Sequence, residues 1–192
     1  VSGRAGGIPS FFDSAVGGTG PHSMAGMGSG FTKIRRNQPI LVDLVHAHRG
    51  YVVDATRMFS VGELQETWEH KLDDMQEISD SVVSSLNRGD DCSRAWEIGS
   101  NLAAEMGHES NLMGMAPDQS RFLGHSVGLQ LDESPVVAAG FNRPLPRNGL
   151  MAIEPKLVYV NGSIGIEDTW VRDDGSMQRL TLDKKADSLT VV

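Results

Sequence analysis

The chain is poor in cysteine and in aromatic residues, and it contains no long apolar run. Its single cysteine, Cys92, excludes an internal disulfide bond, which suits a reducing cytoplasm. The acidic neighbours of this cysteine disfavour a thiolate, so we do not expect a catalytic cysteine. No stretch approaches the roughly 18 to 20 apolar residues that a membrane span needs. The sequence therefore predicts a cytoplasmic protein without a membrane partner.

Basic residues are also scarce, because 17 Lys and Arg stand against 25 Asp and Glu, for a net charge of −8. No basic stripe with interleaved aromatic residues occurs, so nucleic acid is not an expected partner. With 39% apolar and 22% charged residues in 192 positions, the composition is that of one soluble globular domain. Part of the acidity could be gathered in one cluster that a divalent cation neutralises.

Two aspartates eleven residues apart, Asp43 and Asp54, each follow an apolar run typical of a β-strand, ILV and YVV. The intervening HAHRG predicts a hairpin turn, because Gly50 can adopt backbone angles that β-branched residues cannot. Such a hairpin would bring both acids to one place. An aspartate within an apolar strand is costly unless its charge is paired or bound to a metal, so the pair calls for a cation.

Glycine is concentrated in residues 1–30, in the sequences AGG, GGTG and GMGSG. This segment is either a flexible tail or a set of irregular loops shaped against an active site. It contains His22, and a lone histidine in a loop is more often solvated than functional. The chain also starts at Val1 without a helix or a cap, which we interpret as a fragment of a longer protein.

Two amphipathic helices are expected in the middle of the chain. Apolar residues from Leu64 to Leu86 recur with the spacing of three and four that is typical of a helix, which ends near Gly89. A second helix should begin near a capping Asp91 and end at Gly107.

The second half of the chain is rich in strand patterns that contain single polar residues. His125 lies within FLGHSVGLQL, Glu154 within GLMAIEPKLVYV and Glu167 within GSIGIEDTWV. The sequence VNGS predicts a hairpin turn between the last two patterns. Together with Asp43 and Asp54, these residues provide four carboxylates and one imidazole, a donor set suited to two hard or borderline divalent ions. Four buried acids cannot remain ionised together without such ions.

The order of these motifs resembles the catalytic domain shared by prolidase, aminopeptidase P and methionine aminopeptidase, the pita-bread metallopeptidases. The resemblance rests on DATRMFSVG after Asp54, GHSVGL around His125, IEPKLVY around Glu154 and GIEDTWVRDDGSMQRLT around Glu167. It runs from about His22 to Thr181 and is strongest to the C-terminal catalytic domain of an Xaa-Pro dipeptidase. It implies an α+β fold, with a curved antiparallel sheet and helices on its outer face.

The resemblance also implies a dinuclear site that holds Mn, Co, Zn or Fe. Asp54 and Glu167 would bridge the two ions, Asp43 would bind one, and His125 with Glu154 would bind the other. A water molecule activated by the metals would attack the scissile carbonyl of a short peptide, with Glu154 as base and proton shuttle. His22 resembles the family's substrate-contacting histidine and is a candidate catalytic and substrate-binding residue, although its distance from Asp43 in the sequence is slightly long.

One position departs from the family pattern. Where the family often has a histidine seven residues after the metal-binding histidine, this chain has Asp132, followed by Glu133. A carboxylate there would repel a developing oxyanion that an imidazole could stabilise. Three interpretations of Asp132 are open: it plays another part, such as binding the substrate amine, it alters the Xaa-Pro chemistry, or it is an ordinary loop acid.

Residues 1–192 are accordingly interpreted as a catalytic domain without the N-terminal domain that precedes it in prolidases, and a second copy could cover it in a homodimer. We expect a metal-dependent hydrolase of short peptides, with Xaa-Pro bonds as the preferred substrate. Two alternatives remain open: a carbon–nitrogen hydrolase like creatinase, whose reaction needs no metal, and a non-catalytic relative that binds peptides.

Overall fold

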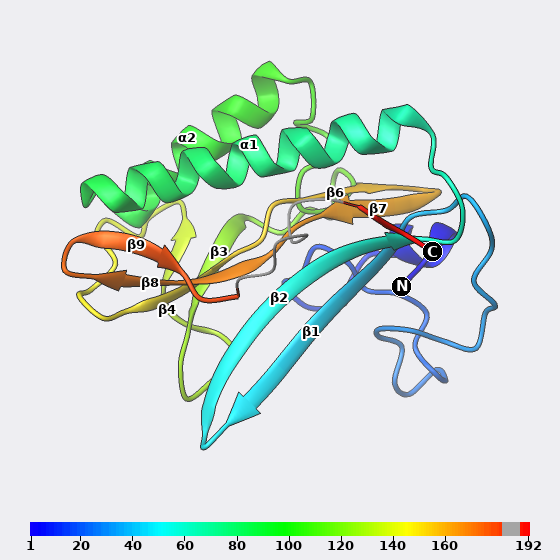
Figure 1. Cartoon of the computed structure of the whole chain (residues 1–192), viewed down its shortest axis with the longest axis horizontal. Helices are drawn as coiled ribbons and strands as arrows, with labels where there is room; N and C mark the ends of the chain where they lie inside the picture. The colour runs from blue at the N-terminus through cyan, green and yellow to red at the C-terminus, as the bar shows by residue number, and fades with distance from the viewer. Residues whose placement is uncertain (182–188) are drawn as a thin grey trace.

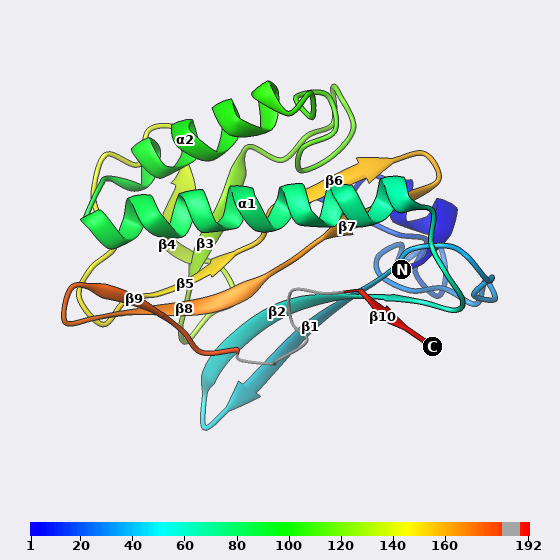
Figure 2. The same ribbon diagram turned by 45° about the horizontal axis from the view of Figure 1, so that its top comes forward.

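Two helices lie side by side on one side of a set of mainly antiparallel strands, and a long hairpin extends away from them (Figures 1 and 2). This computed structural model describes residues 1–181 and 189–192. The helices are α1 (Glu66–Arg88) and α2 (Cys92–Glu105), and a short 3-10 helix spans Gly3–Gly7. Within the described residues, no helix combines the length and the apolar character needed to cross a membrane.

Within the part of the chain that the structure describes, the strands form three sheets. They are β1 (Ile40–His48), β2 (Tyr51–Ser60), β3 (Phe122–Val127), β4 (Glu133–Ala138), β5 (Leu150–Ile153), β6 (Lys156–Tyr159), β7 (Gly162–Gly165), β8 (Asp168–Asp173), β9 (Ser176–Arg179) and β10 (Thr190–Val191). One sheet has the order β1-β2-β10, a second the order β4-β3-β5-β8-β9, and β6 pairs with β7. All pairs are antiparallel except the short pairing of β10 with β2.

The predicted hairpin of the two aspartates is confirmed, but its turn is shorter than expected. The register of β1 and β2 continues to the pair His48 and Tyr51, so only Arg49 and Gly50 form the turn. Both turn residues have positive φ, 53° and 88°. Two-residue hairpin turns need this backbone conformation because it matches the twist of the strands. The longer turn predicted from HAHRG is therefore wrong, since β1 runs on through His46 and His48.

The two predicted helices are confirmed, and they cover the second sheet. The buried face of α1 follows the predicted spacing, with Leu72, Met75 and Ile78 in the core. Its end is set by Gly89, whose positive φ of 85° places its N–H on the carbonyl oxygens of Ser85 and Leu86. These apolar side chains pack with residues of β3 and β5, so the main core lies between the helices and the second sheet.

The two glutamates lie where strands break, not in the middle of strands as predicted. Glu154 follows the last residue of β5 and still donates its N–H to the carbonyl oxygen of Leu123. Pro155 has no N–H to continue that ladder, and the chain then pairs as β6 with β7. Glu167 falls between β7 and β8, and its carbonyl oxygen accepts the N–H of Thr56 on β2. The acids therefore occupy the junction of the three sheets.

The glycine-rich segment is packed against this junction and does not form a tail. Leu41 of β1 donates its N–H to the carbonyl oxygen of Val1, and Gly3 donates to that of Pro39. Several residues of the segment, among them Gly17 and Gly30, line a cavity next to β1. Of the two interpretations of residues 1–30, irregular loops shaped against a site is the one that the structure supports.

Candidate metal centre

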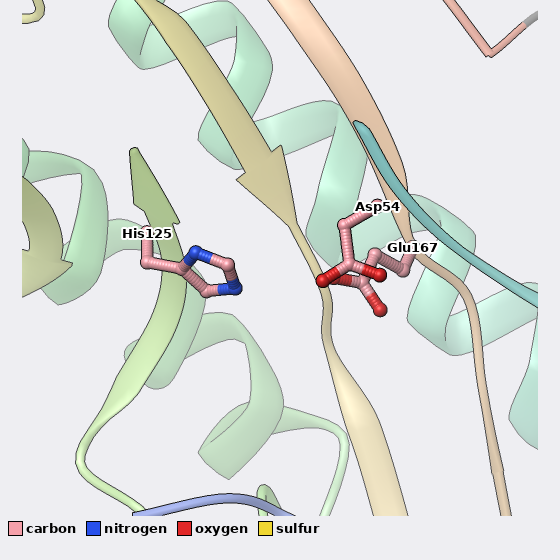
Figure 3. Close-up of side chains that lie close together, drawn as sticks. All are labelled: Asp54, His125 and Glu167. Carbon is pink, nitrogen blue, oxygen red and sulfur yellow. The ribbon is translucent and has the colours of Figure 1, made fainter. Parts of the chain in front are cut away.

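Three side chains from separate segments of the chain converge at the junction of the sheets (Figure 3). Asp54 of β2, His125 of β3 and Glu167 are buried, and one ligand atom from each lies within 4.8 Å of the other two. The carboxylates of Asp54 and Glu167 lie together, and the imidazole of His125 faces them from β3. Two oxygens and one nitrogen at this spacing are suitable donors for a transition-metal cation.

Hydrogen bonds hold the backbone and side chains of this group in place. Asp54 donates its N–H to Thr169 Oγ1 at 3.0 Å, and the same hydroxyl donates to the carbonyl oxygen of Asp54 at 2.8 Å. Thr56 lies two residues along β2, on the same face, and donates from Oγ1 to Glu167 Oε2 at 2.8 Å. These contacts fix the backbone of Asp54 and the carboxylate of Glu167 before any ligand binds.

Arg57 fastens the loop of Glu167 from the other side. Its Nη1 donates to the carbonyl oxygen of Glu167 at 2.8 Å, and its Nη2 pairs with Asp168 Oδ1 at 2.7 Å. The other carboxylate oxygen of Asp168 pairs with Arg179 at 2.5 Å. The charge of Arg57 is thus used to position the backbone of an acid and lies outside the cluster of ligand atoms.

One oxygen of Asp54 remains without a partner. Oδ1 is buried and accepts no hydrogen bond from the described residues. A buried carboxylate oxygen without a partner is costly. Together with the spacing of the three ligand atoms, this oxygen shows that the residues present fit a divalent cation at Asp54, His125 and Glu167.

Glu154 and Asp132 lie on either side of His125. The ring Nε2 lies 3.3 Å from Glu154 Oε1, and Nδ1 lies 3.4 Å from Asp132 Oδ1. Asp132 is mostly exposed, with 74% of its side chain accessible. The acid that replaces the family histidine therefore stands at the rim of the site and contacts the imidazole that the resemblance assigns to the metal.

Lys156 is a member of the cluster that the sequence prediction missed. Its ammonium donates to Glu154 Oε2 and to Glu167 Oε2, the latter at 2.9 Å, and lies 3.5 Å from Asp43 Oδ2. The signal in the sequence was its position two residues after Glu154, because residues so close in the chain stay near each other even where Pro155 separates β5 from β6. A lysine two residues after Glu154 could therefore reach the acids.

The charges of the cluster shift one another's pKa values. Burial, followed by the charge of Asp43, raises the pKa of Asp54 to about 7. Burial also opposes ionisation of Glu154, but Lys156 and His125 outweigh it and lower its pKa to about 2. Burial and the charge of Glu154 raise the pKa of Glu167 well above its usual range. The pocket as it stands therefore carries more acids than its own cations can keep ionised.

The two cations of the cluster remain charged in spite of burial. Burial lowers the pKa of His125, but its hydrogen bond to Glu154 and the surrounding acids outweigh this effect and raise it to about 9. Burial has the same opposing effect on Lys156, whose pKa the three acids raise well above the usual range. The imidazole must lose its proton before it can bind a metal.

A cavity of about 610 Å³ opens over the cluster. Asp43, Asp54, His125, Glu154 and Glu167 all line it, so the structure brings the five predicted metal ligands to one place. The glycine-rich segment and Asp132 form other parts of its wall. This volume is typical of a pocket for a small ligand.

His22 is the predicted site residue that the structure does not bring to the cluster. Its side chain is exposed, and its Nδ1 accepts the N–H of Met24 at 3.3 Å. It is absent from the described residues that line the cavity. The predicted contact of His22 with substrate stays a prediction.

Comparison with known proteins agrees with this geometry. The profile of Metallopeptidase family M24 matches residues 3–173, so the chain belongs to this family. An Xaa-Pro dipeptidase of Pyrococcus horikoshii is 27% identical over 150 residues, which are 78% of this chain and 41% of the relative. Five curated relatives are longer than this chain, which spans between 36% and 46% of their length.

Solved structures confirm the predicted fold. The chain is similar to an X-Pro aminopeptidase from Thermotoga maritima with a TM-score of 0.81, at 22% identity, over 100% of this chain and 48% of the other. It is also similar to a prolidase from Pyrococcus furiosus with a TM-score of 0.77, at 23% identity, over 96% of this chain and 48% of the other. The α+β pita-bread fold, with helices on one side of the sheets, is therefore that of this chain.

Proposed function

We propose that this chain is the catalytic domain of a metal-dependent hydrolase that cleaves short peptides at Xaa-Pro bonds. The observation that carries the proposal is the convergence of Asp54, His125 and Glu167, with a buried and unpartnered Asp54 oxygen, beneath a cavity of about 610 Å³. The matched relatives named as Xaa-Pro dipeptidases and aminopeptidases support the choice of substrate class.

A divalent cation bound at these residues would polarise a carbonyl group and make water a better nucleophile near neutral pH. Glu154 is the proton carrier in this proposal, because Oε1 faces the cluster beside His125. It accepts a proton from the attacking water and passes it to the nitrogen of the leaving amine, so that the cleaved peptide bond yields an acid and a neutral amine.

Asp132 would bind the free amino group of the substrate. Its carboxylate is exposed at the wall of the cavity and is held near the metal cluster by His125. An ammonium group placed there would be attracted by the acid and would leave the first peptide bond over the cluster. This role would suit a dipeptidase or an aminopeptidase, both of which need to recognise a substrate end.

The donors of the cluster suit several transition metals. Carboxylate and imidazole donors suit Mn, Co, Zn and Fe, and the prediction of two ions also requires Asp43 and Glu154 as ligands. Both of these acids now contact Lys156. The predicted homodimer and the cytoplasmic location likewise stay predictions.

The test is hydrolysis of a panel of dipeptides by the purified chain after removal of metal by chelation and after addition of Mn²⁺, Co²⁺, Zn²⁺ or Fe²⁺. Ala-Pro should be cleaved only after addition of metal and faster than Ala-Ala. Equal cleavage of Ala-Pro and Ala-Ala would show that the substrates are short peptides in general and not Xaa-Pro bonds. Failure of every metal to produce hydrolysis would contradict it.

A second candidate function is favoured by Lys156, whose ammonium already neutralises part of the acidic cluster without any metal. This metal-free function would be one of the two alternatives left open by the sequence: carbon–nitrogen hydrolysis without metal, or peptide binding without catalysis. Hydrolysis that persists in excess chelator would select the first of these. Binding of Ala-Pro measured by calorimetry, without turnover under any metal condition, would select the second.

A further inference from the structure

The ammonium of Lys156 lies among three of the four carboxylates of the cluster. It contacts Glu154 Oε2 and Glu167 Oε2, and it lies 3.5 Å from Asp43 Oδ2. Only 3% of the side chain is accessible, so no bulk water separates these groups. A cation that bridges acids from separate segments of the chain occupies the kind of position that a metal ion would otherwise take.

The fold provides space for this lysine. Lys156 pairs with Gly165 in the register of β6 and β7, and a Cβ on Gly165 would lie 2.6 Å from Lys156 Cγ. The stem of the lysine thus crosses the face of the hairpin where β7 has no side chain. The next residue, Leu157, points to the opposite face and belongs to the main core. The lysine is therefore directed to the acids by the strand and by the glycine opposite.

The charge of the cluster limits how many cations it can hold. The four carboxylates carry four negative charges when ionised, and the ammonium leaves three. One divalent ion would leave a single negative charge, whereas two would make the cluster positive with the lysine in place. Buried charges are costly unless they are closely balanced, so the ammonium supplies part of the positive charge that a second divalent ion would otherwise supply.

We propose that Lys156 is a built-in cation that takes the place of one of the two divalent ions, so that the cluster holds a single ion at Asp54, His125 and Glu167. Asp43 and Glu154 then hold the lysine and are not metal ligands. This inference rests on the proposed function for the presence of a metal site, and it changes the number of ions in that site.

The experiment counts ions. The chain is stripped with chelator, equilibrated with Mn²⁺, freed of unbound metal and analysed by mass spectrometry for manganese per chain. Calorimetric titration with Mn²⁺ gives an independent stoichiometry. We expect one ion per chain for the natural sequence and two for Lys156→Met, which keeps most of the length of the side chain and removes its charge.

Lys33→Met is the matched control, because Lys33 is exposed and lies outside the cavity over the cluster. It should bind one ion, like the natural sequence. Electron paramagnetic resonance adds a readout independent of activity: an isolated Mn²⁺ signal in the natural sequence and the control, and a spin-coupled signal from two neighbouring ions in Lys156→Met.

Two ions per chain in the natural sequence would overturn the inference, because the lysine would then yield its position to metal. No ion in the natural sequence would overturn it as well, and so would a folded Lys156→Met that binds only one. If that variant does not fold, the count on the natural sequence still decides. One ion without hydrolysis of any dipeptide would sink the proposed function and leave this inference standing.

Discussion

The two sides of the second sheet bury different kinds of side chain. Under α1 and α2 the buried residues are mainly apolar, and Met75, Ile78 and Leu123 are fully enclosed. On the side of the β1–β2 hairpin, acids, an imidazole and an ammonium are buried within contact of one another. Apolar burial stabilises the fold, whereas buried charge generally costs stability. The difference indicates that packing on the helical side stabilises the fold, whereas the buried charges on the hairpin side form a binding site at some cost in stability.

The largest expected effect is the loss of stability caused by a cavity on the apolar side of the second sheet. Ile78→Ala removes buried methyl groups from α1 and should lower the free energy of unfolding by about 2–5 kcal/mol. Denaturant unfolding followed by circular dichroism measures the change. Val160→Ala, at a position 73% exposed, is the control and should have little effect. The folded fraction of Ile78→Ala should bind as much Mn²⁺ as the natural chain, and loss of metal from that fraction would break the contrast.

The next effect belongs to the charged side. Glu167→Gln removes a donor from the metal centre and should lower kcat/KM for Ala-Pro by at least about 100-fold, since even partners of metal ligands contribute 10–100-fold. It should also abolish stoichiometric Mn²⁺ binding. Glu109→Gln, an exposed acid beyond α2, is the matched control and should behave like the natural chain. Full hydrolysis by Glu167→Gln would show that this acid has no part in the reaction.

A smaller effect is expected from the hydroxyl that supports Glu167. Thr56→Val keeps the shape of the side chain but removes the hydrogen bond to Glu167 Oε2. Affinity for Mn²⁺, measured by calorimetry, should fall by about 10-fold. Thr67→Val on the exposed part of α1 is the control. An unchanged affinity would mean that the strand pairing alone positions the carboxylate.

The smallest effect on stability at neutral pH is expected from Cys92, a titratable residue on the apolar side of the second sheet. Burial raises the pKa of its thiol from 9.0 to about 11. The folded chain then keeps a proton that the unfolded chain loses, so the free energy of unfolding should be unaffected below pH 9 and should fall as the pH rises toward 11.

Cys92→Ala isolates this thiol, and unfolding followed at several pH values between 8 and 11 provides the comparison. The natural chain should lose more stability over this range than Cys92→Ala. Parallel curves for the two chains would show that the thiol ionises as easily in the folded state as in the unfolded state.

The local patterns of the sequence were sufficient for much of the fold. The spacing of apolar residues in α1 and the paired strands around Gly50 are determined by neighbours in the chain, and the structure confirms both. The proximity of Asp43 on β1 and Asp54 on β2 was therefore predictable from the sequence. The breaks at Glu154 and Glu167 were not, because they arise where one strand leaves its sheet to pair in another.

Residues 1–30 and Lys156 show the limit of such patterns. The glycine-rich segment has no hydrophobic period, so its course over the cavity depends on contacts with β1 that are distant in sequence. Lys156 was absent from the predicted site because a lysine in a strand is usually at the surface. Its burial depends on three acids that are distant from one another in the sequence and on the open space at Gly165.

The most direct test of the account is a crystal structure of the chain grown with Mn²⁺, with anomalous diffraction recorded at the manganese absorption edge. The account predicts one strong anomalous peak within coordination distance of Asp54, His125 and Glu167, with the ammonium of Lys156 beside it. A chain that binds manganese elsewhere, or whose Asp54 and Glu167 lie apart, would contradict it.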